Sequence, residues 1–119
     1  MDARSLKDQE LAPGRYPPAP DGLILYLVGD IHGRLDLLRD VHRQIDGDKA
    51  RHGGGPAREI YLGDYIDRGP SSAGVVSQLL DRAASVETVF LRGNHEQMLL
   101  DLLAGHAILE DWLHVGGTA

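Results

Sequence analysis

The chain has 119 residues, enough for one small domain but not for two independent cores, and its hydrophobic content of 42% is ordinary for a globular protein. Its 12 Lys and Arg against 18 Asp and Glu give a net charge of −6, which argues against nucleic acid as a partner because binding a phosphate backbone needs a basic surface. The absence of cysteine excludes a disulfide framework, a thiolate zinc site and a cysteine nucleophile, and it fits a reducing compartment.

Residues 1–22 contain four of the six prolines and little periodic hydrophobicity, so we expect a flexible, proline-rich leader ahead of one domain over 23–119. The leader alternates charges where a secretory signal needs a continuous apolar stretch. The longest apolar run, at 23–28, is far shorter than the ~20 residues of a membrane-spanning helix. These features predict a cytoplasmic protein with no membrane partner.

Three stretches of strand length follow the leader, at 23–28, 59–62 and 87–92, and each ends at a glycine. The first is a continuous apolar run, a pattern typical of a strand that is covered on both faces. An amphipathic stretch follows each strand, so strand and helix alternate three times. Because this alternation with right-handed crossovers gives parallel strands, we expect an α/β fold with a mainly parallel sheet and covering helices.

The helices are predicted from apolar residues at steps of three and four. The first begins at Leu35, the second is capped by Ser71 or Ser72, and the third runs from about 96 to 104, where a glycine stops it. The glycine-rich segment 46–56 predicts a loop, since ordering glycine costs more backbone entropy than ordering any other residue. A sheet of only three strands would leave apolar surface uncovered, which favours association.

Each predicted strand runs into a glycine and then at once into a side-chain oxygen, from Asp30, Asp64 and Asn94. Ligands bind at the carboxyl edge of an open α/β sheet, so we expect these oxygens to converge there. One such dipeptide alone would indicate only a turn, but three in phase favour a site. His32 and His95 add imidazole to the same edge. Oxygen and nitrogen donors without thiolate suit Mn²⁺, Fe, Zn²⁺ or Mg²⁺.

These residues lie in three motifs: Gly-Asp-Ile-His-Gly at 29–33, Gly-Asp-Tyr-Ile-Asp-Arg-Gly at 63–69, and Gly-Asn-His-Glu at 93–96. In order and spacing they resemble the N-terminal signatures of the phosphoprotein phosphatase branch of the calcineurin-like metallophosphoesterases. The resemblance covers about 23–117. It implies the N-terminal βαβαβα half of a metallophosphoesterase sandwich.

The resemblance implies a site with two divalent ions, foremost Mn²⁺, with Fe or Zn²⁺ as alternatives. Asp30 and His32 would bind the first ion, Asp64 would bridge both, and Asn94 would bind the second. A bridging carboxylate offsets the repulsion between two ions ~3.5 to 4 Å apart. A metal-bound hydroxide would then attack phosphorus, because coordination lowers the pKa of water towards neutrality.

The resemblance also implies an acid and a phosphate clamp. His95 would protonate the leaving alkoxide as general acid, and Asp67 would orient that imidazole. Arg68 and Arg92 would bind the phosphoryl oxygens, because a guanidinium can make two parallel bonds to phosphate. The other four histidines are expected in helices or at the surface, and they are His42, His52, His106 and His114.

The implied function is metal-dependent hydrolysis of phosphomonoesters, foremost phosphoserine or phosphothreonine in proteins. Two alternatives stay open: a dinucleoside polyphosphate hydrolase, which shares the first and third motifs, and an inactive phosphatase-like binding module. The partner would be a phosphorylated protein or a small phosphoester, and nothing in the sequence indicates the oligomeric state. The family takes further histidines from its second half, so residues 23–119 are expected to be the N-terminal part of the domain, whose activity alone stays open.

Overall fold

The computed structural model describes residues 19–117, so most of the predicted leader lies outside the described residues. Three strands, β1 (Ile24–Val28), β2 (Ala57–Tyr61) and β3 (Thr88–Phe90), form one parallel sheet in the order β1-β2-β3. Each strand is followed by a helix. The expected α/β fold with a parallel sheet is therefore confirmed. No helix within the described residues is long and apolar enough to cross a bilayer.

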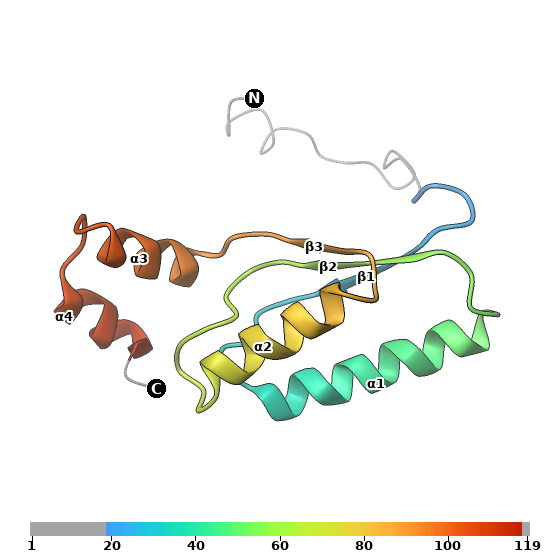
Figure 1. The fold of residues 1–119 in the computed structure, drawn as a ribbon, viewed down its shortest axis with the longest axis horizontal. Helices are drawn as coiled ribbons and strands as arrows, with labels where there is room; N and C mark the ends of the chain where they lie inside the picture. Colours follow the sequence, from blue (N-terminus) through green and yellow to red (C-terminus); the bar gives the residue numbers. More distant parts are fainter. Residues whose placement is uncertain (1–18, 118–119) are drawn as a thin grey trace, which may run out of the picture.

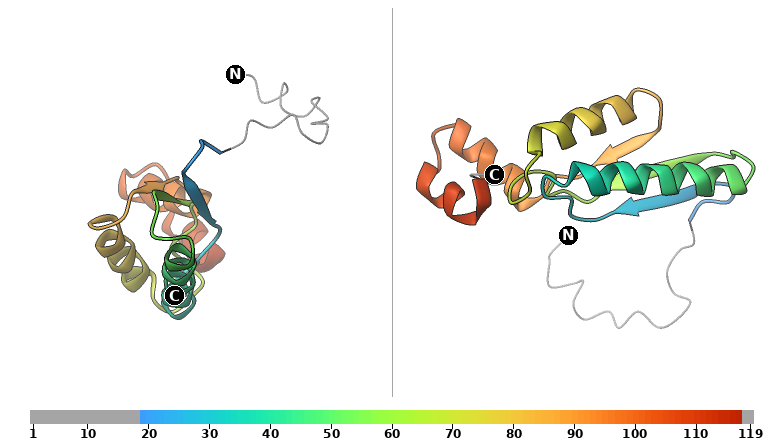
Figure 2. Two further views of the ribbon diagram at one scale, coloured as in Figure 1. Left: turned by 90° about the vertical axis from the view of Figure 1, so that its right-hand side faces the viewer. Right: turned by 90° about the horizontal axis from the view of Figure 1, so that it is seen from below.

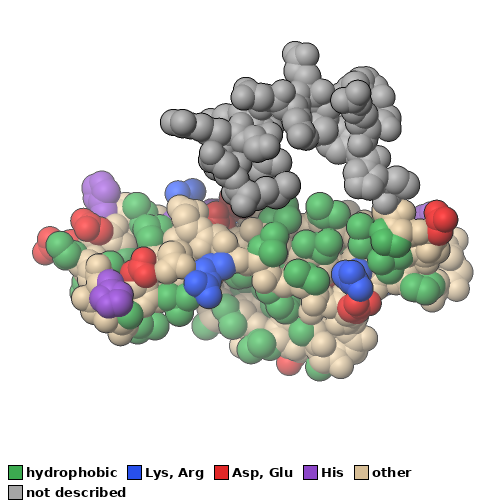
Figure 3. All heavy atoms as spheres, turned by 90° about the horizontal axis from the view of Figure 1, so that it is seen from above, with side chains coloured by type: hydrophobic (Ala, Val, Ile, Leu, Met, Phe, Trp, Pro, Cys, Tyr) green, Lys and Arg blue, Asp and Glu red, His purple; other side chains and the backbone are tan. Residues whose placement is uncertain are grey.

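The helices after β1 and β2 lie on the same face of the sheet. In Figures 1 and 2, α1 (Leu35–Arg51) and α2 (Ser72–Ala83) lie side by side beneath it. On the opposite face Leu27, Ile60 and Val89 stand in register across the three strands, and Figure 3 shows hydrophobic side chains gathered there. Leu27 is 62% exposed. Within the described residues, β1 is therefore covered on one face rather than on both.

The core lies between the sheet and these two helices. Buried apolar side chains from β2, α1, α2 and the loops at the strand ends form one cluster there. Its members are Ile31, Leu38, Tyr61, Tyr65, Ile66, Val75 and Leu79. Because three of them belong to the loops after β1 and β2, the core holds in place the backbone that carries the predicted metal ligands.

The segment 46–56 is not a loop throughout, because α1 continues through its first half to Arg51. Glycine inside a helix costs about 1 kcal/mol relative to alanine, but contacts made by the last turns oppose that cost. Lys49 Nζ lies 3.0 Å from a carboxylate oxygen of Glu59 on β2, and Arg82 on α2 binds Asp46. Tertiary contacts thus extend the helix past the point where its sequence weakens.

A buried ionic cluster lies under the helix-covered face of β2. The Glu59 carboxylate is fully buried and accepts hydrogen bonds from Arg82 (2.6 Å), Tyr61 (2.6 Å) and Lys49 (3.0 Å). Burial by itself raises the pKa of Glu59, but these donors outweigh it and lower that pKa to about 2. The cluster joins β2 to both covering helices, and the strand pattern of the sequence did not predict it.

The C-terminal part folds beyond the carboxyl ends of the strands (Figure 1). Here α3 (Asn94–Leu103) begins two residues before its predicted start and ends ahead of Gly105, whose φ of 77° suits a helix stop. A short helix, α4 (Leu109–Trp112), follows, and then a turn at Leu113–Gly117 that leaves helical geometry at Gly116. This turn returns the chain towards the loop after β2.

Candidate metal centre

Three of the predicted metal ligands converge at the strand ends. Asp30, His32 and Asp64 each offer a ligand atom, and these atoms lie within 4.8 Å of one another. His32 Nδ1 lies 2.9 Å from the carbonyl oxygen of Ile66. A carbonyl can only accept, so Nδ1 carries the proton and Nε2 keeps its lone pair for a ligand. Two carboxylates and one neutral imidazole are a donor set that fits a divalent transition metal.

Asn94 lies beside this group. The terminal amide atom that faces Asp64 is 3.1 Å from both carboxylate oxygens of Asp64. A nitrogen at this place donates to the carboxylate, whereas an oxygen there needs a cation between itself and Asp64. The backbone N–H of His95 also donates to Asp64 Oδ1, at 3.1 Å. The end of β2 and the start of α3 therefore meet at Asp64.

The backbone at this edge is held in an unusual conformation. Within the described residues, the four non-glycine residues with positive φ are His32 (44°), Asp64 (56°), Asp67 (71°) and Arg68 (70°). Each such residue is costly unless its surroundings enforce it, and strain of this kind concentrates at functional sites. All four were singled out from the motifs alone.

Two glycines let the strand-end loops approach each other closely. Gly63 has a φ of 107°, and a Cβ added to it would collide with the backbone of Gly93. A Cβ on Gly93 would in turn collide with the Asp64 side chain. Gly63 is required both by its backbone angle and by the space available, and Gly93 is required by the space alone. The contact places the third motif directly against the second.

Glu96 ties these two loops together, a role that the sequence reasoning missed. Its carboxylate accepts backbone hydrogen bonds from Asp64 (2.6 Å), Tyr65 (2.9 Å) and Gly93 (3.0 Å). The bond to Gly93 is the helix-capping interaction of α3. The sequence does show a glutamate three residues after the glycine at the start of α3, which is a helix-capping pattern. This pattern predicts the hydrogen bond to Gly93 but not those to Asp64 and Tyr65.

His95 and Asp67 form a buried pair. His95 Nδ1 lies 2.9 Å from Asp67 Oδ2, and each residue is 2% exposed. Since the carboxylate accepts from Nδ1, the other ring nitrogen, Nε2, remains for exchange with a ligand. The His95 ring also makes an edge contact with the His32 ring, with the centroids 4.8 Å apart. The pair therefore lies next to the metal-ligand group.

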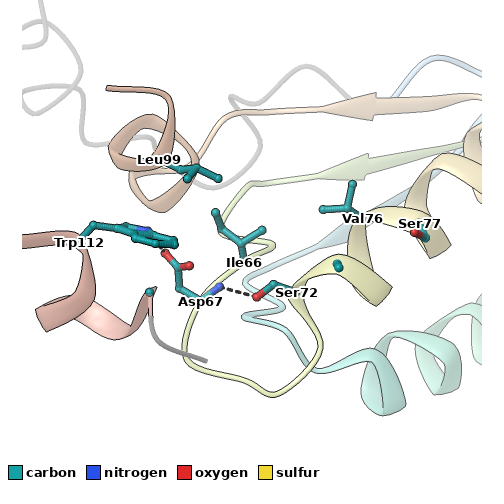
Figure 4. Close-up of a pocket in the computed structure, with 9 residues that line it drawn as sticks. Ile66, Asp67, Ser72, Val76, Ser77, Leu99 and Trp112 are labelled. Carbon is teal, nitrogen blue, oxygen red and sulfur yellow. Dashed lines mark hydrogen bonds between the residues drawn. The ribbon is translucent and has the colours of Figure 1, made fainter. Parts of the chain in front are cut away.

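Trp112 also reaches this pair, and the sequence reasoning assigned it no role. Its indole N–H donates to Asp67 Oδ2 at 2.9 Å, although 45 residues separate the two. Figure 4 shows the indole beside the Asp67 carboxylate at one end of a cavity of about 460 Å³, with the Asp67 N–H bonded to Ser72. Ile66 and Leu99 add apolar walls to that cavity. No short-range sequence signal connects Trp112 to Asp67.

The two predicted phosphate-binding arginines line different hollows. Arg68 is exposed and shares a hollow of about 720 Å³ with Arg34 and Arg39. Arg92 is exposed, donates to Gln97 at 3.0 Å, and borders a hollow of about 340 Å³ beside α3. Both arginines are accessible to an anionic ligand.

The remaining histidines lie outside the metal-ligand group of the described residues. His42 is buried on α1, where Nε2 is 3.0 Å from the Tyr61 hydroxyl, and burial lowers its pKa. His52, His106 and His114 are exposed. His114 therefore does not pack within a helix as expected.

Tyr65 is buried near the site and its hydroxyl donates to the Leu91 carbonyl at 2.6 Å. Burial raises the pKa of Tyr65 to about 12.

A parallel α/β sheet thus gathers nitrogen and oxygen donors for a divalent metal ion at its carboxyl edge, beside a buried histidine–aspartate pair. The chain belongs to the calcineurin-like phosphoesterase family, whose model matches residues 24–117. This match confirms the resemblance drawn from the three motifs.

The known relatives of the chain include proteins with two different named activities. Serine/threonine-protein phosphatase 1 of Salmonella typhimurium is 36% identical over 95 residues, which are 78% of this chain and 38% of the relative. The symmetrical bis(5'-nucleosyl)-tetraphosphatase of Yersinia enterocolitica is 36% identical over 81 residues, or 67% of this chain and 25% of the relative. The chain thus spans less than half the length of these relatives.

Proposed function

We propose that this chain supplies the metal-binding part of a hydrolase that cleaves phosphomonoesters, foremost phosphoserine and phosphothreonine in proteins. The observation that carries the proposal is the meeting of Asp30, His32 and Asp64 beside the buried His95–Asp67 pair. Divalent ions held there, with Mn²⁺ as the first candidate, would activate water and stabilise charge on the phosphoryl group. The absence of cysteine supports a reducing, cytoplasmic setting.

The chain's own residues divide the work between binding and proton transfer. His32 presents Nε2 because its Nδ1–H is engaged by the Ile66 carbonyl. Asp67 holds His95 through Nδ1, so His95 Nε2 is the atom that gives a proton to the departing alkoxide. Arg68 and Arg92 bind phosphoryl oxygens of the substrate and offset the negative charge that develops there.

A second candidate function is hydrolysis of dinucleoside polyphosphates. The relatives of the chain include enzymes of this kind. The hollow that Arg34, Arg39 and Arg68 line also supports it, because several guanidinium groups together suit a chain of phosphates. A third possibility is a binding module that holds metal or a phosphorylated partner without turnover.

Activity assays separate these functions. We expect Mn²⁺-dependent release of phosphate from a phosphoserine peptide, at a higher rate than cleavage of diadenosine tetraphosphate. Faster turnover of the nucleotide would make the second candidate the function. Arg39→Ala should then reduce nucleotide cleavage, whereas Arg43→Ala, one turn further along α1, should not.

The variant His95→Ala distinguishes an enzyme from a binding module. Loss of a general acid is expected to lower turnover by about 10²- to 10⁴-fold while Mn²⁺ binding stays the same. His106→Ala is the matched control, because His106 is exposed and lies outside the metal-ligand group. Equal rates for the wild-type chain and His95→Ala, both at the level of the uncatalysed reaction, would support the binding module instead.

A further inference from the structure

We infer that Trp112 is a positioning residue for the His95–Asp67 pair, an inference that rests on the proposed hydrolase function. Trp112 is the single tryptophan of the chain. Its Nε1–H donates to Asp67 Oδ2 at 2.9 Å, and His95 Nδ1 lies 2.9 Å from the same oxygen. The imidazole and the indole therefore share one carboxylate oxygen (Figure 4 shows the indole side).

Sharing this oxygen restricts how the Asp67 carboxylate can rotate. The torsion that turns a carboxylate is broad and has no sharp preference of its own, so its orientation depends on hydrogen bonds. Asp67 is 2% exposed, and a buried carboxylate is stable only when donors surround it. With Trp112 in place, Oδ2 is held from a second direction, and the imidazole of His95 is held with it.

The chain around Trp112 is fitted to this contact. The carbonyl of Gly116 accepts a hydrogen bond from the backbone N–H of Arg68 at 3.0 Å, so the turn after Trp112 is tied to the residue after Asp67. Gly116 has a φ of 112°, and a Cβ on it would press on the Arg68 side chain. A Cβ on Gly117 would collide with the indole ring. Two successive glycines thus allow the chain to close over the Asp67 loop.

Core packing does not account for the place of Trp112. It is half-buried, lies at the end of a four-residue helix and is not a member of the core cluster. Its polar atom is instead directed at a carboxylate that the proposed reaction uses. This arrangement is the one expected of a residue that orients an acid through its partner.

The first test uses Trp112→Phe, which keeps an aromatic ring and removes the N–H. We expect about a 10-fold or greater loss of kcat with phenyl phosphate and a smaller loss with 4-nitrophenyl phosphate, because a poor leaving group depends more on a positioned acid. Mn²⁺ affinity should not change. Tyr26→Phe is the control, since it removes a hydrogen bond to Asp48 on the far part of α1. Equal losses with both esters would show a merely structural role and overturn the inference.

The second test needs no turnover. Because the chain has one tryptophan, a ¹H–¹⁵N correlation spectrum contains one indole N–H signal. Asp67→Ala should move this signal upfield and speed its exchange with water, whereas Asp101→Ala on α3 should leave it in place. An unmoved signal in Asp67→Ala overturns the inference even in an active enzyme. A chain that cleaves neither ester but shows the shift contradicts the proposed function and supports the Trp112–Asp67 contact.

Discussion

Replacing Glu96 with glutamine is expected to weaken Mn²⁺ binding about 10- to 100-fold. In the wild-type chain Oε1 accepts from the N–H groups of Asp64 (2.6 Å) and Gly93 (3.0 Å), and Oε2 accepts from that of Tyr65 (2.9 Å). Glutamine keeps the shape but has only one oxygen. Whichever end carries the amide nitrogen, at least one backbone N–H then faces another donor.

The size of the effect follows from these contacts. Leaving one buried N–H without an acceptor costs about 1–3 kcal/mol, and the loops relax to recover part of it. The relaxation moves Asp64, whose own N–H makes the shortest of the three bonds. A 10- to 100-fold loss of metal affinity corresponds to about 1.4–2.7 kcal/mol, which lies within that range.

Isothermal titration of the chain with Mn²⁺ measures the change, and far-UV circular dichroism shows whether the variant is folded. Gln97→Ala is the matched control, because Gln97 is the next residue of α3 and its exposed side chain binds the side chains of Arg92 and Asp101, not the backbone N–H groups that Glu96 binds. Unchanged Mn²⁺ affinity in a folded Glu96→Gln variant would refute the role given to Glu96.

Three further predictions concern stability. Leu38→Ala, in the core, should lower the free energy of unfolding by about 2–5 kcal/mol in a urea titration, whereas Leu37→Ala at an exposed site should change it little. Gly63→Ala should lower the midpoint temperature of thermal unfolding and weaken Mn²⁺ binding, because the new Cβ would collide with the backbone of Gly93. The lowered pKa of Glu59, about 2 against 4.5, should contribute on the order of 3 kcal/mol that is present above pH ~4.5 and lost as the pH falls towards 2. Glu59→Gln should remove that part of the acid dependence, and an unchanged acid profile would contradict it.

The order of elements and the candidate metal group could be predicted from the sequence because both depend on local pattern and on one topological rule. Alternating strands and helices imply parallel strands, and parallel strands bring their carboxyl ends to one edge. That rule alone is enough to place Asp30, His32 and Asp64 near one another, and in the structure their ligand atoms lie within 4.8 Å.

Other features depended on contacts between residues far apart in the chain. The length of α1 reflects the ion pairs that its last turns make with β2 and α2. Glu96 binds the backbone of Asp64 in the loop after β2, although the two residues are 32 positions apart in the sequence. The sequence also could not predict that one face of the sheet is left uncovered, because an apolar run does not indicate which side of a strand a helix will cover. Trp112 is the clearest case.

The sequence by itself determined the family, the parallel sheet and the residues at its edge, since motif order and hydrophobic period are written locally. Only the tertiary structure decided that His95 and Trp112, which follow Asp67 by 28 and 45 residues, share one of its carboxylate oxygens. Hydrogen bonds of this kind have no period and no fixed spacing. They form because packing brings two donors within reach of a buried carboxylate, and because burying that charge without donors would cost too much free energy.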